Sequence, residues 1–596
     1  MIMDKEQAKA KIKDTFESPF DKNRFTLFIK DLLNRVDASK AFPKPLTGSY
    51  IKESFRDCVK SYDRLGRFTD DNGKKIDILT ACLHKKTTLE HARTKQRNFI
   101  AGYLKGDYGG RSLKDAALVA FYHEDSPDWR FSLVTIDHVF DEQKATVAQE
   151  FSPAKRRSFL VGADENSHTA QSQLIPILAD VDHDPTREKL EEAFDIEKVT
   201  TEFFKRYRAL YLDLSRHVDE VMKEEQSQRI RKEFEQRGID KEVFSKKLLG
   251  QIVFLYFLQK KGWLGAKEKW GDGDKKFLRN LFTECKQRDR NFFNDYLEYL
   301  FYDALNNEHR GGVDPSIHPR FNCKIPFLNG GLFEPINNYD WQNTDLFLPN
   351  ELFSNKKDGS DEGSGILDLF DLFNFTVKED EPLEKEVAVD PEMLGKVFEN
   401  LLEVKDRKSK GTYYTPREIV HYMCQQSLIS YLDTQLNGKP AAHERIGDQE
   451  LDMLGNAQKR GQLDLTVEHK PESLIPKEHI EQLILCGEQV VENEATVEAK
   501  GRETGTYSYR LRETIRRNAE LIDEKLASIR VCDPAIGSGA FLVGIMTEIV
   551  KARNVLSVFI TPPIIPPLSG GDESLLPDKG GTQGGVENCP PDKGGD

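Results

Sequence analysis

The chain has 596 residues, of which 38% are hydrophobic and 31% are charged, and its formal net charge is −14 at pH 7. This length predicts several domains, and the negative charge disfavours indiscriminate binding to polyanions, so any contact with nucleic acid would have to come from local basic patches. The eight cysteines form no CxxC or CxxxC pair, which argues against a zinc ribbon or a disulfide framework and suits a reducing compartment.

The N-terminal stretch "MIMDKEQAKAKIKD" lacks the continuous apolar core of a signal peptide. The longest apolar run, Leu248–Leu258, is well short of the roughly 20 residues that are needed to cross a bilayer. We therefore predict a cytoplasmic protein without a membrane partner.

Residues 1–165 are predicted to form an α/β domain. The apolar segments "KIDILTACL", "DAALVAFY" and "WRFSLVTID" are strand-like, and the basic stretch "TLEHARTKQRNFIAGYL" is helix-like. Asp77 could begin the Asp and (Asp/Glu)-x-Lys pattern of a metal-dependent nuclease, but no (Asp/Glu)-x-Lys follows on the next strand-like segment. His123, Glu124 and Asp125 have the composition of a solvated turn. We assign neither a nuclease site nor a metal site.

Residues 166–400 are predicted to be mainly helical. From Thr186 onward, apolar residues recur every three or four positions without Pro or Gly for about 50 residues, which is typical of long helices. Asn329–Gly331 predicts a tight turn, and the polar stretch Ser354–Gly365 predicts a loop.

Residues 401–557 carry two stretches that predict chemistry. In "VCDPAIGSGAFL" a strand-like run ends at Asp533-Pro534 and passes through Gly537 and Gly539 into a helix-forming segment. Glycines at this spacing allow the backbone to approach a ligand, and a carboxylate at the end of a strand suits a ligand with an ammonium group. Leu542 replaces the third Gly of GxGxxG, and no Walker lysine follows. An ordinary strand-to-helix turn is the alternative interpretation.

The second stretch is "GTYYTP", which ends at Pro416. Pro416 is a candidate helix start with Thr415 as its N-cap, and Tyr413 and Tyr414 could cover a flat ligand. A capped amphipathic helix with aromatic packing explains the same residues. The charged segment of about 438–519, between the two stretches, is predicted to be a surface insertion.

Together, "GTYYTP" and "DPAIGSGAFL" resemble the two S-adenosylmethionine motifs of gamma-class N6-adenine DNA methyltransferases, in particular the large type IIG restriction-modification methylases. The resemblance implies an incomplete Rossmann-like class I methyltransferase domain that binds S-adenosyl-L-methionine and acts on double-stranded DNA. It implies that Tyr414, Thr415 and Pro416 line the methionine side of the cofactor. It further implies that Asp533, which precedes Pro534, contacts the amino group of the cofactor. Gly537 and Gly539 would allow the backbone to approach the cofactor closely.

The family's catalytic NPPY-type motif has no match in this sequence. Thr561–Ile564 reads "TPPI", with Thr in place of the amide or carboxylate and Ile in place of the aromatic residue, so we assign no catalytic residue. Residues 558–596 are rich in Pro and Gly, repeat "PDKGG", and are predicted to be a disordered tail that replaces the rest of the domain. The chain is thus expected to be either an adenine methyltransferase that is inactive alone, or a cofactor-binding or scaffold subunit that acts with a separate catalytic or specificity chain.

Overall fold

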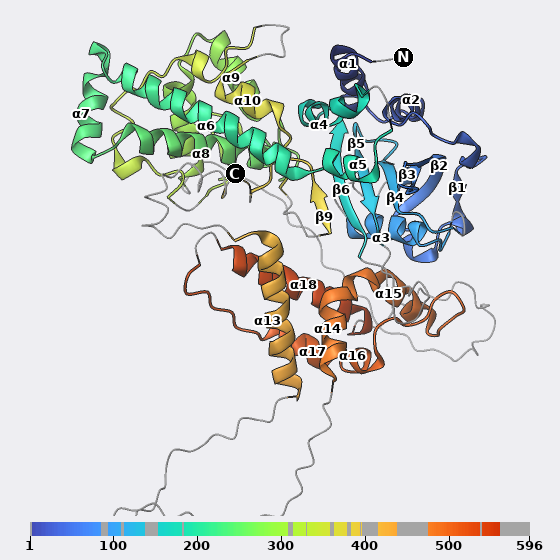
Figure 1. Ribbon diagram of the computed structural model, residues 1–596. Coiled ribbons are helices and arrows are strands. Elements are labelled where there is room, and N and C mark those ends of the chain that lie inside the picture. Colours follow the sequence, from blue (N-terminus) through green and yellow to red (C-terminus); the bar gives the residue numbers. More distant parts are fainter. Residues whose placement is uncertain are drawn as a thin grey trace, which may run out of the picture.

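The computed structural model combines a mixed sheet, a large helical part and a C-terminal cluster of helices (Figure 1). It describes residues 3–84, 93–108, 112–137, 153–180, 184–307, 314–328, 331–357, 363–377, 383–391, 393, 395, 415–437, 475–536 and 539–560. The fold is therefore mixed α/β with a high helical content, as the sequence predicts.

The N-terminal part is built on a seven-stranded sheet of order β1-β2-β3-β4-β5-β6-β9. The pairs β3–β4 and β6–β9 are parallel, and the other neighbours are antiparallel. The three segments predicted as strands are confirmed as β3, β4 and β5. The strands are β1 (Leu46–Thr47), β2 (Val59–Thr69), β3 (Lys75–Leu83), β4 (Ala116–Tyr122), β5 (Asp128–Thr135), β6 (Lys155–Gly162) and β9 (Glu384–Glu386).

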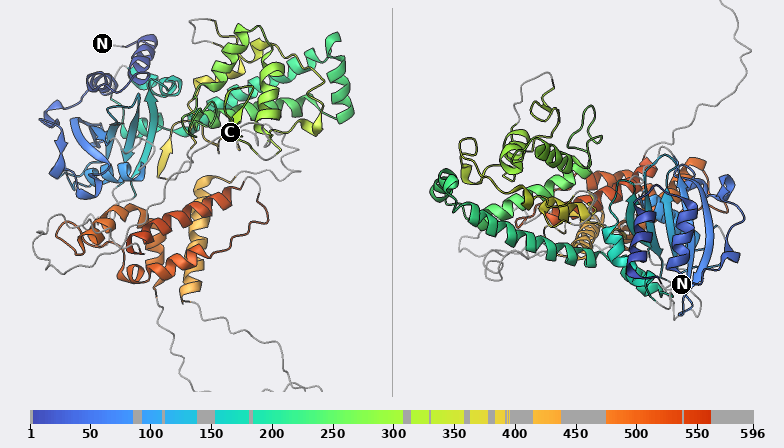
Figure 2. Two further views of the ribbon diagram at one scale, coloured as in Figure 1. Left: turned by 180° about the vertical axis from the view of Figure 1, so that it is seen from behind. Right: turned by 90° about the horizontal axis from the view of Figure 1, so that it is seen from above.

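Helices cover both faces of this sheet (Figure 2). On one face, Phe16 and Phe28 pack against Trp129 and Phe131; on the other, Phe99 packs against Tyr62. Because both faces are covered, β3 and β5 are buried along almost their whole length instead of at alternate residues. The helices of this part are α1 (Lys5–Phe16), α2 (Lys22–Leu32), α3 (Arg93–Leu104), α4 (His168–Leu178) and α5 (Arg187–Ala193).

The helical part follows the sheet along the chain. Helix α6 buries a set of apolar residues whose spacing of three and four places them on one face: Val199, Phe203, Tyr207, Leu210, Leu214 and Val218. The helices of this part are α6 (Ile196–Val221), α7 (Gln228–Arg237), α8 (Lys241–Lys260), α9 (Phe277–Gln287) and α10 (Ile366–Leu372). The same part contains π-helical turns at Phe293–Leu297 and Tyr299–Leu305 and a two-stranded ladder of β7 (Ile317–His318) and β8 (Cys323–Lys324).

Strand β9 returns the chain from the helical part to the sheet. Arg130 of β5 donates to Glu386 at 2.8 Å, and Arg156 of β6 donates to Glu384 at 3.0 Å. All four side chains are buried, so these charge pairs exclude water from the junction. Residues 384–386, which the sequence places in the helical region, therefore lie in the sheet.

The C-terminal cluster has a core of its own. Ile480 and Leu483 of α14 and Ile515 of α16 are buried in it together with α13 and α18. The predicted surface insertion is thus wrong for residues 475–519, because apolar side chains at helical spacing pack inward while the charged ones face solvent. The helices are α13 (Arg417–Asn437), α14 (Lys477–Cys486), α15 (Val491–Lys500), α16 (Glu513–Arg517), α17 (Ala519–Ala527) and α18 (Ala540–Ile560).

In the contact between this cluster and the sheet part, α3 meets the 3-10 turn Gly487–Gln489 and α15. Thr94 donates to Glu488 at 2.9 Å, and Asn98 donates to Glu492 at 3.1 Å. Helix α18 continues to Ile560, so the tail boundary predicted at 558 falls inside its last turn. The rest of the tail, the turn at Asn329–Gly330 and residues 438–474 lie outside the described residues. Among the described helices, each is too short or too polar to cross a membrane.

Glu386 gives the sheet junction a specific acid sensitivity. Burial by itself raises the pKa of Glu386, but the charges of Arg130 and Arg93 outweigh burial and lower the pKa to about 2. A lowered carboxyl pKa stabilises the fold above the ordinary value of 4.5, and this contribution is lost as the pH falls from there to about 2.

We expect Glu386→Gln to lower the free energy of unfolding by about 3–5 kcal/mol at pH 7, since it leaves buried arginines without a counter-charge. The loss should shrink as the pH approaches 2. Thermal unfolding followed by fluorescence across this pH range measures both effects. Lys385→Gln is the matched control on the same strand, where an outward pair with Glu418 contributes less than about 1 kcal/mol. Equal losses for the two variants would contradict the assignment.

Candidate cofactor site

Thr415 and Pro416 stand directly before α13. The carbonyl oxygen of Pro416 accepts hydrogen bonds from the amides of Ile419 and Val420, at 3.0 and 3.1 Å. Pro416 therefore occupies the position that accepts the first helical bond, one residue later than the N-cap predicted at Thr415. Tyr414 lies outside the described residues. The start of α13 leaves amide groups that are not used inside the helix and that favour acceptor groups of a ligand.

Asp533 is partly buried, and Pro534 is exposed in the turn that follows it. Asp533 Oδ1 accepts a hydrogen bond from the amide of Ala535 at 2.9 Å, which forms a tight turn, and Ile536 is 54% exposed. The strand predicted to end at Asp533 is not formed, because no described strand lies beside residues 531–533 to satisfy their backbone groups. This is a correction to the sequence-based interpretation.

The loop enters α18 through Gly539. Its φ of +81° is favourable for glycine, and its amide donates to the carbonyl of Ile536 at 2.7 Å. A Cβ atom at this position would meet nothing within 4 Å, so the backbone is open to approach there. Gly537 lies outside the described residues.

The N-terminal halves of α13 and α18 are in contact (Figure 1). A Cβ on Gly544 would lie 2.8 Å from Cγ1 of Val420 and 3.3 Å from Sγ of Cys424, so glycine permits the close approach of the two helices. Cys424 Sγ also lies 3.7 Å from the carbonyl oxygen of Phe541. The structure thus brings into contact the two helices that follow the predicted stretches.

A buried polar pair joins the same two helices one turn further on. His421 Nδ1 lies 2.8 Å from Glu548 Oε1, and Gln425 donates to Glu548 Oε2 at 2.9 Å. Burial alone raises the pKa of Glu548, but the hydrogen bond from His421 and the charge of Lys551 outweigh it and lower the pKa. This pair fixes the rotation of one helix relative to the other.

These contact residues were not predicted from the sequence. Val420, Cys424 and Leu428 recur every four positions in α13, as do Gly544, Glu548 and Ala552 in α18, and all six are buried. This repeat is the signal that could have identified the paired helices. Because buried polar groups are hydrogen-bonded, the carboxylate of Glu548 within this repeat indicates that a polar side chain pairs with it.

The alternative metal and nuclease sites gain no support in the described part of the chain. Asp77 is buried and lies 2.5 Å from Arg67 Nε, with Tyr103 also donating to it. Glu124 and Asp125 are exposed, and Lys60 pairs with Glu124 at 2.7 Å. The described residues contain no group of three His, Cys, Asp or Glu side chains that could hold a metal ion.

The chain is similar to a protein of Methanocaldococcus jannaschii that is provisionally named a type II restriction enzyme and methyltransferase. The two are 25% identical over 322 residues, which is 53% of this chain and 21% of that protein. The chain therefore spans about a fifth of the length of this relative. No family model matches the chain, and no solved structure matches it.

We expect Gly544→Ala to destabilise the C-terminal cluster by about 1–3 kcal/mol, because the new methyl group meets the stiff side chain of Val420. Adding Val420→Ala should recover part of the loss. Chemical denaturation followed by circular dichroism measures both variants. Gly505→Ala is the control, since a Cβ there meets nothing within 4 Å. Additive losses in the double variant would contradict the contact.

Proposed function

We propose that the chain is the cofactor-binding portion of an adenine-specific DNA methyltransferase of a restriction-modification system. The observation that supports this proposal is the contact between α13 and α18, the helices that follow the two predicted cofactor stretches in the sequence. The similarity to a protein named a restriction enzyme and methyltransferase supports the same class of reaction.

The residues at the two helix starts suit S-adenosyl-L-methionine. The cofactor has an ammonium group for Asp533, which accepts a hydrogen bond from the Ala535 amide through Oδ1. It has a carboxylate, which the positive end of a helix dipole favours. Gly539 leaves the backbone open, and Thr415, Pro416 and Pro534 border the same two starts, with Tyr414 and Gly537 assigned from the sequence.

When bound, the cofactor supplies an electrophilic methyl group on a sulfonium. In this proposal the chain's own residues hold and orient that group, and the rate depends on how well an adenine N6 amine is positioned in line with it. Asp533 fixes one end through its charge, while the packed pair His421–Glu548 keeps the two helix starts at a constant separation. The adenine-binding residues of an NPPY-type motif must come from elsewhere, because the sequence has none.

A second candidate is a cofactor-binding or scaffold subunit that pairs with a separate catalytic or specificity chain. Exposed apolar side chains on the outer faces of α13 and α18 favour it: Tyr422 is 62% exposed, and Ile419, Met423, Met546 and Val550 are about half exposed. Residues 531–533 lie beside no described strand. In this interpretation added strands pair with that segment and complete a Rossmann-like sheet.

We expect Asp533→Ala and Asp533→Asn each to weaken S-adenosylmethionine binding at least about tenfold, measured by calorimetry, since both remove a charge-assisted hydrogen bond. Asparagine keeps a side-chain oxygen that can accept the hydrogen bond from the Ala535 amide. A loss of cofactor affinity in both variants is therefore due to the missing charge and not to a disrupted turn. Glu520→Ala changes an exposed carboxylate on α17 and should leave affinity unchanged. Unchanged affinity in Asp533→Asn would refute the site.

The same protein, incubated with labelled cofactor and adenine-containing duplex DNA, distinguishes the two candidates. Transfer only after addition of a chain that carries an NPPY-type motif supports the scaffold role. Cofactor binding with no transfer under either condition supports a methyltransferase portion that is inactive alone. Transfer by this chain alone would overturn the conclusion that its catalytic residues come from elsewhere.

A further inference from the structure

The C-terminal cluster has an apolar core that it shares with no other part of the described chain. All side chains of this core, buried or partly buried, lie between residues 428 and 560. Figure 1 shows the cluster in orange and red below the sheet part. Two parts of a protein that meet without a common hydrophobic core are expected to move relative to each other.

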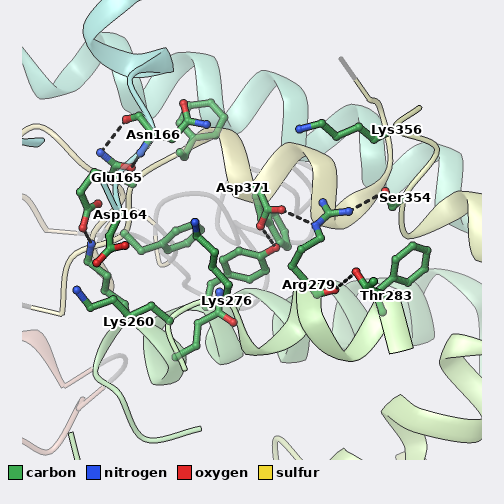
Figure 3. Close-up of a pocket in the computed structure, with 18 of the residues that line it drawn as sticks. Asp164, Glu165, Asn166, Lys260, Lys276, Arg279, Thr283, Ser354, Lys356 and Asp371 are labelled. Carbon is green, nitrogen blue, oxygen red and sulfur yellow. Dashed lines mark hydrogen bonds and ion pairs between the residues drawn. The ribbon is translucent and has the colours of Figure 1, made fainter. Parts of the chain in front are cut away.

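The sheet part and the helical part are joined in the opposite way. Their buried side chains form one continuous apolar core, which extends from Ala8 to Met393. Figure 3 shows Lys260 of α8 and Glu165, which follows β6, at the cleft between these parts. The two residues form an ion pair, in which Glu165 is buried and Lys260 is 14% exposed. The sheet part and the helical part therefore form one body, against which the cluster is docked.

Polar side chains of α3 hold the cluster against this body. Thr94 donates to Glu488 at 2.9 Å, and Asn98 donates to Glu492 at 3.1 Å. Arg97 lies 3.9 Å from Glu488, which is longer than a hydrogen bond. A hydrogen bond of this kind contributes only about 0.5–3 kcal/mol net, because water supplies a replacement partner when the contact opens.

Exposed charges extend the contact at its edge. Lys500 of α15 pairs with Glu53 at 2.6 Å, and the Glu53 side chain is 51% exposed. Lys52 lies 5.9 Å from the centre of the Tyr507 ring, within the range of a cation–π interaction. An exposed ion pair contributes at most about 1 kcal/mol, and dissolved salt screens it further.

One further ion pair reaches the start of α13. Lys385 of β9 pairs with Glu418 at 2.7 Å, and Glu418 lies in the first turn of α13, two residues after Pro416. The hydrogen bond from Lys385 is the largest influence that lowers the pKa of Glu418. With the pair intact, the lysine offsets the negative charge of Glu418 at this helix start. With the pair separated, that charge is no longer offset by Lys385.

We propose that the C-terminal cluster is reversibly docked and that ionic strength sets the fraction of docked molecules, because its exposed ion pairs weaken as salt rises. The helices of the cluster move together, since its apolar core and the pair His421–Glu548 lie within it. Undocking separates Lys385 from Glu418 and makes the start of α13 more negative, which disfavours the carboxylate of a bound cofactor. This effect on the cofactor rests on the proposed function, whereas the docking itself does not.

Carbodiimide coupling of the full chain, followed by mass spectrometry, tests the proposal, because the reagent joins a lysine to a carboxylate only where the two are in contact. The coupled pairs Lys500–Glu53 and Lys385–Glu418 report the docked state. Coupling is measured from about 0.1 to about 1 M NaCl, over which the Debye length falls from roughly 10 to roughly 3 Å.

The pair Lys60–Glu124 is the internal control for screening. It lies within the sheet part, has a distance of 2.7 Å and is similarly exposed, so salt weakens it without any undocking. We expect the yields of the two docking pairs to fall at least about threefold more than the yield of this control. A parallel loss in all three pairs would overturn the proposal, since screening alone would explain it.

The double variant Thr94→Val/Asn98→Ala tests docking at constant low salt. It removes donors on α3 that belong to neither docking pair, and we expect both docking yields to fall together by at least about twofold. The control pair within the sheet part should keep its yield, which also establishes that this part is folded. Asp523→Asn is the matched variant, because it breaks an exposed pair with Arg553 inside the cluster, at 2.7 Å. Unchanged docking yields in the double variant, or an equal loss in Asp523→Asn, would overturn the proposal.

Calorimetry with S-adenosylmethionine on the same double variant tests the effect on the cofactor site. We expect at least about twofold weaker binding, which corresponds to the loss of one exposed ion pair. Lower docking yields with unchanged affinity would refute this effect. Absence of cofactor binding by the unaltered chain would refute the proposed function, while the coupling yields would still decide whether the cluster docks reversibly.

Discussion

The pairing of Arg130 and Arg156 with Glu386 and Glu384 holds the architecture together. These charges are buried, and separating them would leave uncompensated charge in a medium of low dielectric constant. The chain that leaves the sheet after β6 must therefore come back to it at β9, after the whole helical part. Arg97 of α3 extends the network, since it lies 3.7 Å from Glu384 and 3.9 Å from Glu488 of the C-terminal cluster. One buried network thus links all three parts.

Much of the sheet and of the long helices follows from local pattern. The apolar runs of β3, β4 and β5 and the three- and four-residue spacing of α6 are strong enough to predict both elements without tertiary information. Strand β9 could not be predicted in this way. Its sequence, Glu-Lys-Glu, is typical of a solvated loop, and it becomes a buried strand only because arginines more than 200 residues earlier supply the opposite charge.

The candidate cofactor site likewise has residues that the sequence predicts and contacts that only the folded structure shows. The glycines, Asp533 and Pro416 could be selected from the sequence because special backbone positions restrict residue type. The contact of Gly544 with Val420 and the pair His421–Glu548 join residues about 125 positions apart, and only the folded chain reveals them. The strand predicted before Asp533 did not form, because a strand depends on neighbours that sequence pattern cannot supply.

The central claim is that α13 and α18 together present one cofactor site. Hydrogen–deuterium exchange of the full chain, with and without S-adenosylmethionine, tests it most directly, because a cofactor bound between the two helix starts should cover the amides of both at once. The account predicts slower exchange in residues 417–421 and 540–544 at the same cofactor concentration. Protection at only one of these starts, or only elsewhere in the chain, would contradict it.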